Sequence, residues 1–173
     1  MSRKKIILLG EIGVGKTSLI RRFVFDQFET SYKGTIGFNI YTTAIVGVGA
    51  GRDETLEFLI WDTDGDDAQR ILRRKATTHG TAGVIVVADL VRPRTIATMA
   101  SLASTCITEL PGRHVHLILN KSDLSPASAT GAIEKHTALD HLHLPLLTAS
   151  AKSGDNVESA FRAVADAILR RGL

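Results

Sequence analysis

Residues 10–17 read Gly10-Glu11-Ile12-Gly13-Val14-Gly15-Lys16-Thr17 and match the phosphate-binding pattern G-x-x-x-x-G-K-[ST]. The apolar run Ile6-Ile7-Leu8-Leu9 before it predicts a buried strand, and the apolar spacing after it predicts a helix. Such a strand, turn and helix N-terminus form an anion site, because glycines let backbone N–H groups turn toward phosphate oxygens and the helix dipole favours negative charge. The pattern predicts that Lys16 reaches the outer phosphates and that the Thr17 hydroxyl ligates Mg²⁺. We therefore expect a nucleoside phosphate as the ligand of this phosphate loop (residues 10–17).

Length and composition predict one globular domain over residues 1–173. The chain is 44% hydrophobic and 23% charged, and its net charge of +3 is too small to indicate a nucleic-acid partner. Cys106 is the single cysteine, which fits a reducing compartment. The sequence contains no apolar run near the roughly 20 residues that span a bilayer, no signal-peptide core and no C-terminal cysteine for prenylation. We expect a cytoplasmic protein without a covalent lipid anchor in this chain.

The rest of the chain alternates short apolar runs with amphipathic stretches. Strands are predicted at 38–46 and 56–61, and the glycine-rich turn between them predicts an antiparallel hairpin. Further strands, apolar almost throughout and therefore covered on both faces, are predicted at 83–88, 115–119 and 144–149, with helices at about 67–78, 94–109, 127–141 and 155–171. The result is an α/β fold with a six-stranded, mostly parallel sheet, one antiparallel edge strand and about five helices.

In parallel sheets of this kind the ligand lies outside the carboxyl ends of the strands, so the loops that follow the strands are candidate site segments. Asp62-Thr63-Asp64-Gly65 follows the strand at 56–61. An aspartate there can hold a water on Mg²⁺, and a glycine there lets its N–H approach a terminal phosphate. The pattern D-x-x-G is weak alone, but its position after a strand downstream of Lys16 strengthens it.

Two later loops indicate guanine. Asn120-Lys121-Ser122-Asp123 follows the strand at 115–119, and the Asp123 carboxylate can accept hydrogen bonds from the N1–H and amino group of guanine, a donor pair that adenine lacks. Lys121 can lay its aliphatic stem along the base. Ser150-Ala151-Lys152 can direct backbone N–H groups at a base oxygen. A polar turn and a plain helix-entry loop are the alternatives for these two segments.

Together the four segments resemble those of the Ras superfamily of small GTPases, most nearly its Rab-like members, over nearly the whole chain. The resemblance implies the small G-protein fold of P-loop NTPases, with residues 1–173 forming one GTP-binding domain that takes GTP or GDP with Mg²⁺. It assigns catalysis to Lys16, Thr35, Gly65 and Asp66, and it assigns Mg²⁺ to Thr17, Thr35 and, through a water, Asp62. It assigns the nucleotide to Gly13, Val14, Gly15, Lys16, Thr17, Ser18, Phe28, Tyr32, Thr35, Gly65, Asn120, Lys121, Asp123, Ser150, Ala151 and Lys152.

The resemblance also implies two nucleotide-dependent switches. Thr35 matches the switch I threonine, which ligates Mg²⁺ and contacts the γ-phosphate only with GTP bound, and the segment from Asp62 onward matches switch II. Phe28 matches the aromatic that packs on guanine, although a core position would be about as natural for it. Effector, exchange-factor and GTPase-activator proteins are expected to bind through residues about 28–40 and 62–78.

Two residues depart from the family where GTP is hydrolysed. Asp66 occupies the place of the glutamine that orients the attacking water, and Ile12 stands where the family mostly has a small residue. Both departures predict slow hydrolysis, unless Gln69, Arg70 or a residue of a partner positions the water instead. The absence of the prenylated cysteines of Rab-like proteins has two explanations, a tail removed from this chain or a soluble, prokaryotic Ras-like branch.

Alternative functions remain open at this stage. One is a GTP-bound scaffold that presents a constant effector surface without turnover. Another is a P-loop enzyme that uses ATP, which leaves the segment Asn120-Lys121-Ser122-Asp123 unexplained. The histidines are expected to be surface residues rather than a metal cluster, because their spacing is irregular; they are His114, His116, His136, His141 and His143.

Overall fold

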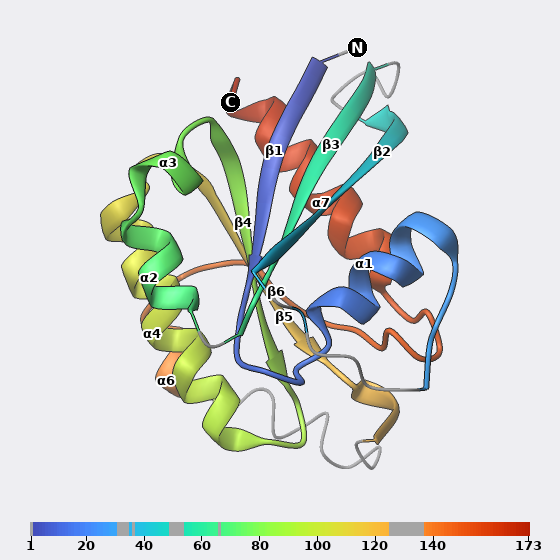
Figure 1. The fold of residues 1–173 in the computed structure, drawn as a ribbon, viewed down its shortest axis with the longest axis vertical. Helices are drawn as coiled ribbons and strands as arrows, with labels where there is room; N and C mark the ends of the chain where they lie inside the picture. The colour runs from blue at the N-terminus through green and yellow to red at the C-terminus, as the bar shows by residue number, and fades with distance from the viewer. Residues whose placement is uncertain (1, 31–34, 36, 49–53, 66, 125–136) are drawn as a thin grey trace.

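The protein is a layered α/β structure built on one sheet. The computed structural model describes residues 2–30, 35, 37–48, 54–65, 67–124 and 137–173. In this part of the chain six strands form a sheet in the order β2-β3-β1-β4-β5-β6 (Figure 1). All neighbouring strands run parallel except β2 and β3, which form the antiparallel pair at one edge. The predicted fold class is confirmed.

The strands follow the apolar runs of the sequence closely. Their bounds are β1 (Ser2–Leu9), β2 (Phe38–Val48), β3 (Glu54–Thr63), β4 (Thr81–Asp89), β5 (His114–Asn120) and β6 (Leu146–Thr148). Because β3 and β5 run further than predicted, Asp62, Thr63 and Asn120 lie at the ends of strands rather than in the following loops. These residues therefore have fixed positions in the sheet.

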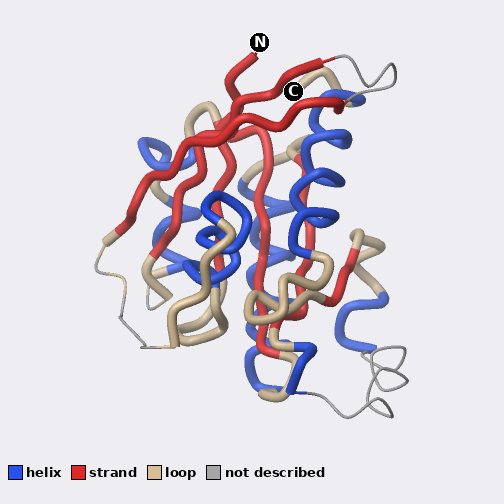
Figure 2. Tube along the Cα trace, turned by 90° about the vertical axis from the view of Figure 1, so that its right-hand side faces the viewer, coloured by secondary structure: helices blue, strands red, loops and turns tan. Residues whose placement is uncertain are grey.

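Helices cover both faces of the sheet. The described helices are α1 (Lys16–Phe25), α2 (Ala68–Arg73), α3 (Lys75–Thr78), α4 (Pro93–Glu109), α6 (Thr137–Asp140) and α7 (Val157–Arg170), with a 3₁₀ turn η1 (Ser122–Leu124). In Figure 1, α1 and α7 lie on one side of the sheet, and α2, α3, α4 and α6 lie on the other. Figure 2, turned by 90°, brings the α1 and α7 side toward the viewer.

Two hydrophobic cores result from the alternation of side chains along the central strands. In β1, Ile6 and Leu8 join Phe161 of α7 in one core, whereas Ile7 and Leu9 join Met99 of α4 and its neighbours in the other. Every residue of β4 and β5 is buried. This explains why these strands read as continuous apolar runs, and it holds their carboxyl ends rigidly at one edge of the molecule.

Two predicted elements differ from those observed. The helix expected at 67–78 breaks at Arg74, which is extended, because Lys75 and Ala76 do not continue the apolar stripe of Ile71 and Leu72. The last strand covers only Leu146–Thr148 and is half-buried, because it is an edge strand that pairs with β5 alone. The predicted helix at 127–141 is described only from Thr137, where α6 begins.

The expected surface position was wrong for two histidines. His114 and His116 are 4% and 3% exposed, because β5 is covered on both faces. His141 and His143 are exposed as predicted, and His136 lies outside the described residues.

Within the described residues, no helix combines the length and the apolar character that crossing a lipid bilayer requires.

Candidate functional site

A cavity of about 510 Å³ opens at the carboxyl ends of the strands. Many of the residues predicted from the sequence line it, namely Gly13, Gly15, Lys16, Thr17, Ser18, Phe28, Thr35, Gly65, Asn120, Lys121, Asp123, Ala151 and Lys152. Val14, Asp62 and Ser150 are fully buried and do not line the cavity. Tyr32 and Asp66 lie outside the described residues. The topology thus brings together segments that lie more than a hundred residues apart.

Two glycines of the phosphate loop are required by close backbone contacts. A Cβ on Gly10 would lie 2.2 Å from the Val87 carbonyl oxygen, and one on Gly15 would lie 2.3 Å from Nδ2 of Asn120. Both glycines also have positive φ, 148° and 97°. The loop therefore closes tightly over β4 and β5, and residues with side chains do not fit at these two positions.

Side-chain donors hold five consecutive carbonyl groups of the phosphate loop. Lys16 Nζ donates to the oxygens of Gly10 (2.8 Å) and Glu11 (3.0 Å), Arg92 to that of Ile12 (3.1 Å), Lys121 Nζ to that of Gly13 (2.8 Å), and Asn120 Nδ2 to that of Val14 (2.9 Å). The C=O and N–H of a planar trans peptide point in opposite directions. With its carbonyls held by these donors, the loop turns the following N–H groups away from them, an arrangement suited to an anion.

Three oxygen-bearing side chains meet at the start of α1. Thr17 Oγ1 donates to Asp62 Oδ2 at 2.6 Å and lies 3.1 Å from Thr35 Oγ1. Asp62 is fully buried, and its Oδ1 accepts no hydrogen bond within the described residues. Burial raises the pKa of the Asp62 carboxyl above its ordinary value, while the Thr17 hydrogen bond and the nearby Lys16 charge oppose that rise. Hydroxyl and carboxylate oxygens with a free buried acceptor suit a hard divalent cation such as Mg²⁺.

The opposite end of the cavity contains Asp123. Ser150 Oγ donates to Asp123 Oδ1 at 2.6 Å, and Lys152 Nζ lies 3.9 Å from Oδ2. The backbone N–H groups of Ser150 and Ala151, which were expected to face a base, have hydrogen-bond partners within the protein. They donate to the Asp155 carbonyl (3.0 Å) and to Asn120 Oδ1 (3.1 Å). In this structure Ser150 and Ala151 orient Asp123 and Asn120. Binding of a base oxygen by the Lys152 N–H stays a prediction.

The aromatic and lysine side chains expected around a base lie in the same cavity. Phe28 is 36% exposed and lines the cavity, so it does not occupy the core position that was its alternative. Lys121 has a positive φ of 67°, and its ammonium joins the phosphate loop to Asp89 at 2.7 Å. The cavity therefore combines an apolar side chain, a lysine stem and a carboxylate at one end.

The segment around Gly65 packs directly on the phosphate loop. A Cβ on Gly65 would lie 2.3 Å from the backbone nitrogen of Ile12, whose side chain is 43% exposed beside the cavity. The two residues considered as replacements for a water-positioning group are engaged elsewhere. Gln69 bonds to Ser101 and Thr105 of α4, and Arg70 pairs with Asp67.

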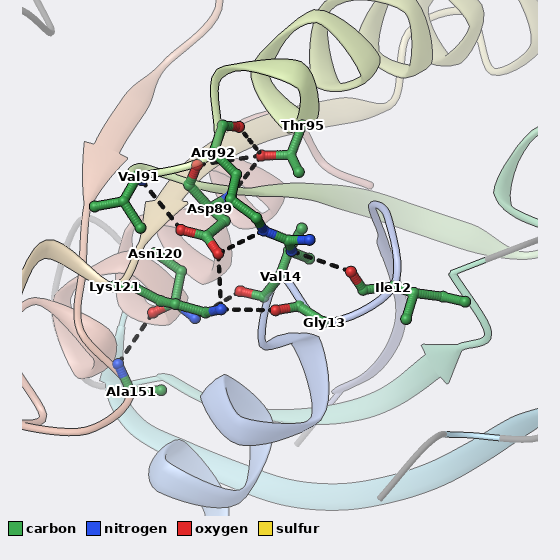
Figure 3. A network of polar contacts seen from close by, with 10 residues as sticks. All are labelled: Ile12, Gly13, Val14, Asp89, Val91, Arg92, Thr95, Asn120, Lys121 and Ala151. Atoms are coloured by element: carbon green, nitrogen blue, oxygen red, sulfur yellow. Dashed lines mark hydrogen bonds and ion pairs between the residues drawn. The ribbon is translucent and has the colours of Figure 1, made fainter. Parts of the chain in front are cut away.

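The sequence interpretation missed the loop after β4. Asp89 ends this buried strand, is itself 2% exposed, and binds Arg92 and Lys121 (Figure 3). Burial alone would raise the pKa of Asp89, but hydrogen bonds from Lys121, Arg92 and the Val91 N–H hold it below its ordinary value. A polar side chain at the end of an apolar strand is the same signal that identified Asp62 and Asn120, and it was present here.

Comparison with models of known protein families identifies a family for this chain. The family model described as "Ras family" matches residues 5–170, which is nearly the whole chain.

Proposed function

Because this chain belongs to the Ras family, a family of guanine-nucleotide-binding switches, we propose that residues 1–173 form one GTP-binding domain that hydrolyses GTP slowly. Members of this family bind GTP and GDP with Mg²⁺ and cleave the terminal phosphate of GTP by attack of water. The observation that carries the proposal is the cavity, which is lined by the phosphate loop, Thr17, Thr35 and Asp123, with Asp62 buried behind its wall and bonded to Thr17.

The phosphates of the nucleotide would lie on the phosphate loop. The carbonyls of residues 10–14 already accept side-chain hydrogen bonds, so the N–H groups that follow them are turned away from these donors, toward the place where phosphate oxygens would lie. Lys16 would exchange its carbonyl partners for phosphate oxygens at little cost, because its ammonium is already at the loop. Gly13, Val14, Gly15, Lys16, Thr17 and Ser18 would form this part of the site.

Guanine would lie between Phe28, Lys121 and Asp123. Ser150 fixes one oxygen of the Asp123 carboxylate, which leaves lone pairs for the N1–H and amino group of guanine. Adenine presents no such donor pair and would leave the carboxylate without its partners. Asn120 joins this loop to the phosphate loop through the Val14 carbonyl and would keep the base and phosphate sites in register.

Thr17, Thr35 and Asp62 would hold Mg²⁺, with Asp62 acting through a water. When bound, Mg²⁺ supplies positive charge that neutralises the phosphate oxygens. The Thr17 hydroxyl would turn from Asp62 toward the ion, and Thr35 would be held in place only when a γ-phosphate is present. Ordering of residues about 28–40 and 62–78 would then display the partner surface, on which Phe38 and Ile40 are already 48% and 49% exposed.

Slow hydrolysis is proposed from Asp66 and Ile12. An aspartate adds negative charge beside the anionic γ-phosphate, and the branched Ile12 side chain crowds the cavity where an activator's arginine would enter. Gln69 and Arg70 contact α4 and Asp67 and so offer no replacement in this conformation.

The test is a single-turnover measurement of protein loaded with GTP. Asp66→Gln combined with Ile12→Gly is expected to speed hydrolysis by about tenfold or more, a modest part of what water positioning and an arginine supply in this family. Asp67→Gln is the matched control, because it removes a neighbouring charge that is paired with Arg70. An unchanged rate in the double variant would show that other groups limit hydrolysis.

A second candidate is a GTP-bound module without turnover, favoured by the same two residues. The nucleotide content of the purified protein separates the two functions. A locked module retains GTP, whereas a slow switch holds mostly GDP. A clear preference for ATP over GTP in a competition assay would overturn both.

A further inference from the structure

Arg92 contacts the phosphate loop from outside the family motifs. It is the last residue before α4, and its guanidinium donates to the Ile12 carbonyl oxygen at 3.1 Å (Figure 3). The neighbouring Gly13 is close enough that a Cβ there would lie 3.6 Å from the same guanidinium nitrogen. Arg92 therefore lies against the peptide that joins Ile12 to Gly13.

A buried carboxylate aims the Arg92 side chain. Nε of Arg92 donates to Asp89 Oδ2 at 2.8 Å, and the other carboxylate oxygen accepts the Val91 N–H at 3.1 Å. The Asp89 side chain is only 2% exposed, so it has little freedom to move. Pro93 follows at the first turn of α4 and limits the backbone beside Arg92. The restricted backbone of Arg92 and its ion pair with Asp89 therefore both limit where the guanidinium can lie.

The fork of arginine suits this position. One nitrogen, Nε, binds Asp89 while another binds the Ile12 carbonyl, so a single planar group serves two acceptors. A lysine has one nitrogen at the end of a flexible chain and would have to divide its hydrogen bonds between the two acceptors. Asp89 also binds Lys121, whose ammonium holds the next carbonyl, that of Gly13. One carboxylate therefore organises the donors for two consecutive peptides of the loop.

We propose that Arg92 is a positioning residue for nucleotide binding, which holds the Ile12–Gly13 peptide with its carbonyl outward and its N–H toward the phosphates. The inference rests on the proposed function, since it concerns the same site. Loss of this hydrogen bond lets the Ile12–Gly13 peptide rotate, and the free loop then spends less time in the form that binds phosphate. Arg92 consequently slows the release of nucleotide without touching it.

The test measures release of a fluorescent N-methylanthraniloyl derivative of GDP from the full chain with excess unlabelled GDP. Arg92→Met is expected to release it about five to ten times faster, the net effect of losing one ordinary protein hydrogen bond at a partly exposed side chain. Arg92→Lys is expected to fall between Arg92→Met and the unaltered protein. Arg94→Met is the matched control, because Arg94 is an exposed arginine in the first turn of the same helix, and its release rate should stay within about twofold.

Thermal unfolding of each variant with GDP bound separates positioning from a purely structural role. Equal release rates in Arg92→Met and Arg94→Met would overturn the inference. So would equally accelerated release in Arg92→Met and Arg92→Lys, if both variants also showed the same fall in melting temperature. Failure of the unaltered protein to bind the fluorescent GDP would overturn the proposed function first and this inference with it.

Discussion

The buried pair His114 and His116 predicts that the protein loses stability in mild acid. Both lie in β5 with ring centroids 5.7 Å apart, and none of their ring nitrogens has a hydrogen-bond partner in the described part of the chain. Burial lowers the pKa of each imidazole from 6.5 to about 4, and for His114 the neighbouring His116, Arg171 and Arg170 add to this effect. Both are neutral in the folded protein at pH 7.

The sign of the effect follows from proton binding. Between pH 6.5 and about pH 4 the unfolded chain binds protons that the folded protein excludes, so stability is complete above pH 6.5 and falls as the pH falls. At pH 5, about 1.5 pH units below the unfolded pKa, the loss is about 2 kcal/mol per histidine at roughly 1.4 kcal/mol per pH unit. For the pair, about 3 to 4 kcal/mol is a large share of the 5–15 kcal/mol typical of a domain.

The assay is urea unfolding at pH 7 and pH 5, compared between the unaltered protein and His114→Leu/His116→Leu. The double variant is expected to lose about 3 kcal/mol less than the unaltered protein over this range, because it has no imidazoles to protonate in β5. His79→Gln is the matched control, because it also removes an imidazole, but from an exposed position outside β5. The same pH dependence in the double variant and the unaltered protein would refute the reasoning. Comparing the double variant with the unaltered protein also cancels the contributions of Asp62 and Asp89 to the pH dependence of stability, because both proteins contain these residues.

Three further predictions concern the site. Gly65→Ala places a Cβ 2.3 Å from the Ile12 nitrogen, an overpacking cost on the order of 1–3 kcal/mol, and should weaken GTP binding by about tenfold or more in a competition assay; equal affinity would mean that the segment moves freely off the loop. Asp62→Asn should weaken Mg²⁺ binding by about 10–100-fold, so the rate of GDP release, measured with and without EDTA, should differ less between the two conditions than in the unaltered protein. Asp123→Asn should bind GTP more weakly and xanthosine triphosphate more tightly, since an amide pairs with one donor and one acceptor of a base. The control variant Asp140→Asn should change neither affinity.

Most of the fold could be predicted from the sequence because its signals are local. The strands β1 and β4 contain long apolar runs, the composition that burial on both faces favours. Failures occurred where a neighbour decides the outcome. The chain leaves the helix at Arg74, where the apolar stripe of Ile71 and Leu72 is not continued, and β6 is short because in the described part of the chain it pairs with β5 alone.

The candidate site was predictable in its residue types but not in its connections. Five residues lie at the ends of strands or shortly after them in a recognisable order: Lys16, Thr17, Asp62, Asn120 and Asp123. The structure gathers them around one cavity or directly behind its wall. The amides of Ser150 and Ala151 were expected to face a base. The Ser150 N–H instead donates to the Asp155 carbonyl within the same loop, and the Ala151 N–H donates to Asn120, a partner that depends on which strands are neighbours.

The sequence by itself determined that this protein has a glycine-rich loop of the phosphate-binding pattern between a strand and a helix, since glycine spacing and a following helix are properties of a continuous segment. Only the tertiary structure decided how that loop is held. Arg92 lies 80 residues from Ile12 and Lys121 lies 108 residues from Gly13, and their contacts exist because β1, β4 and β5 are adjacent and end at the same edge of the sheet. A hydrogen bond needs its two atoms within about 3 Å. For groups so far apart along the chain, the packing of the strands brings the atoms to this distance, and a local sequence pattern contains no information about that packing.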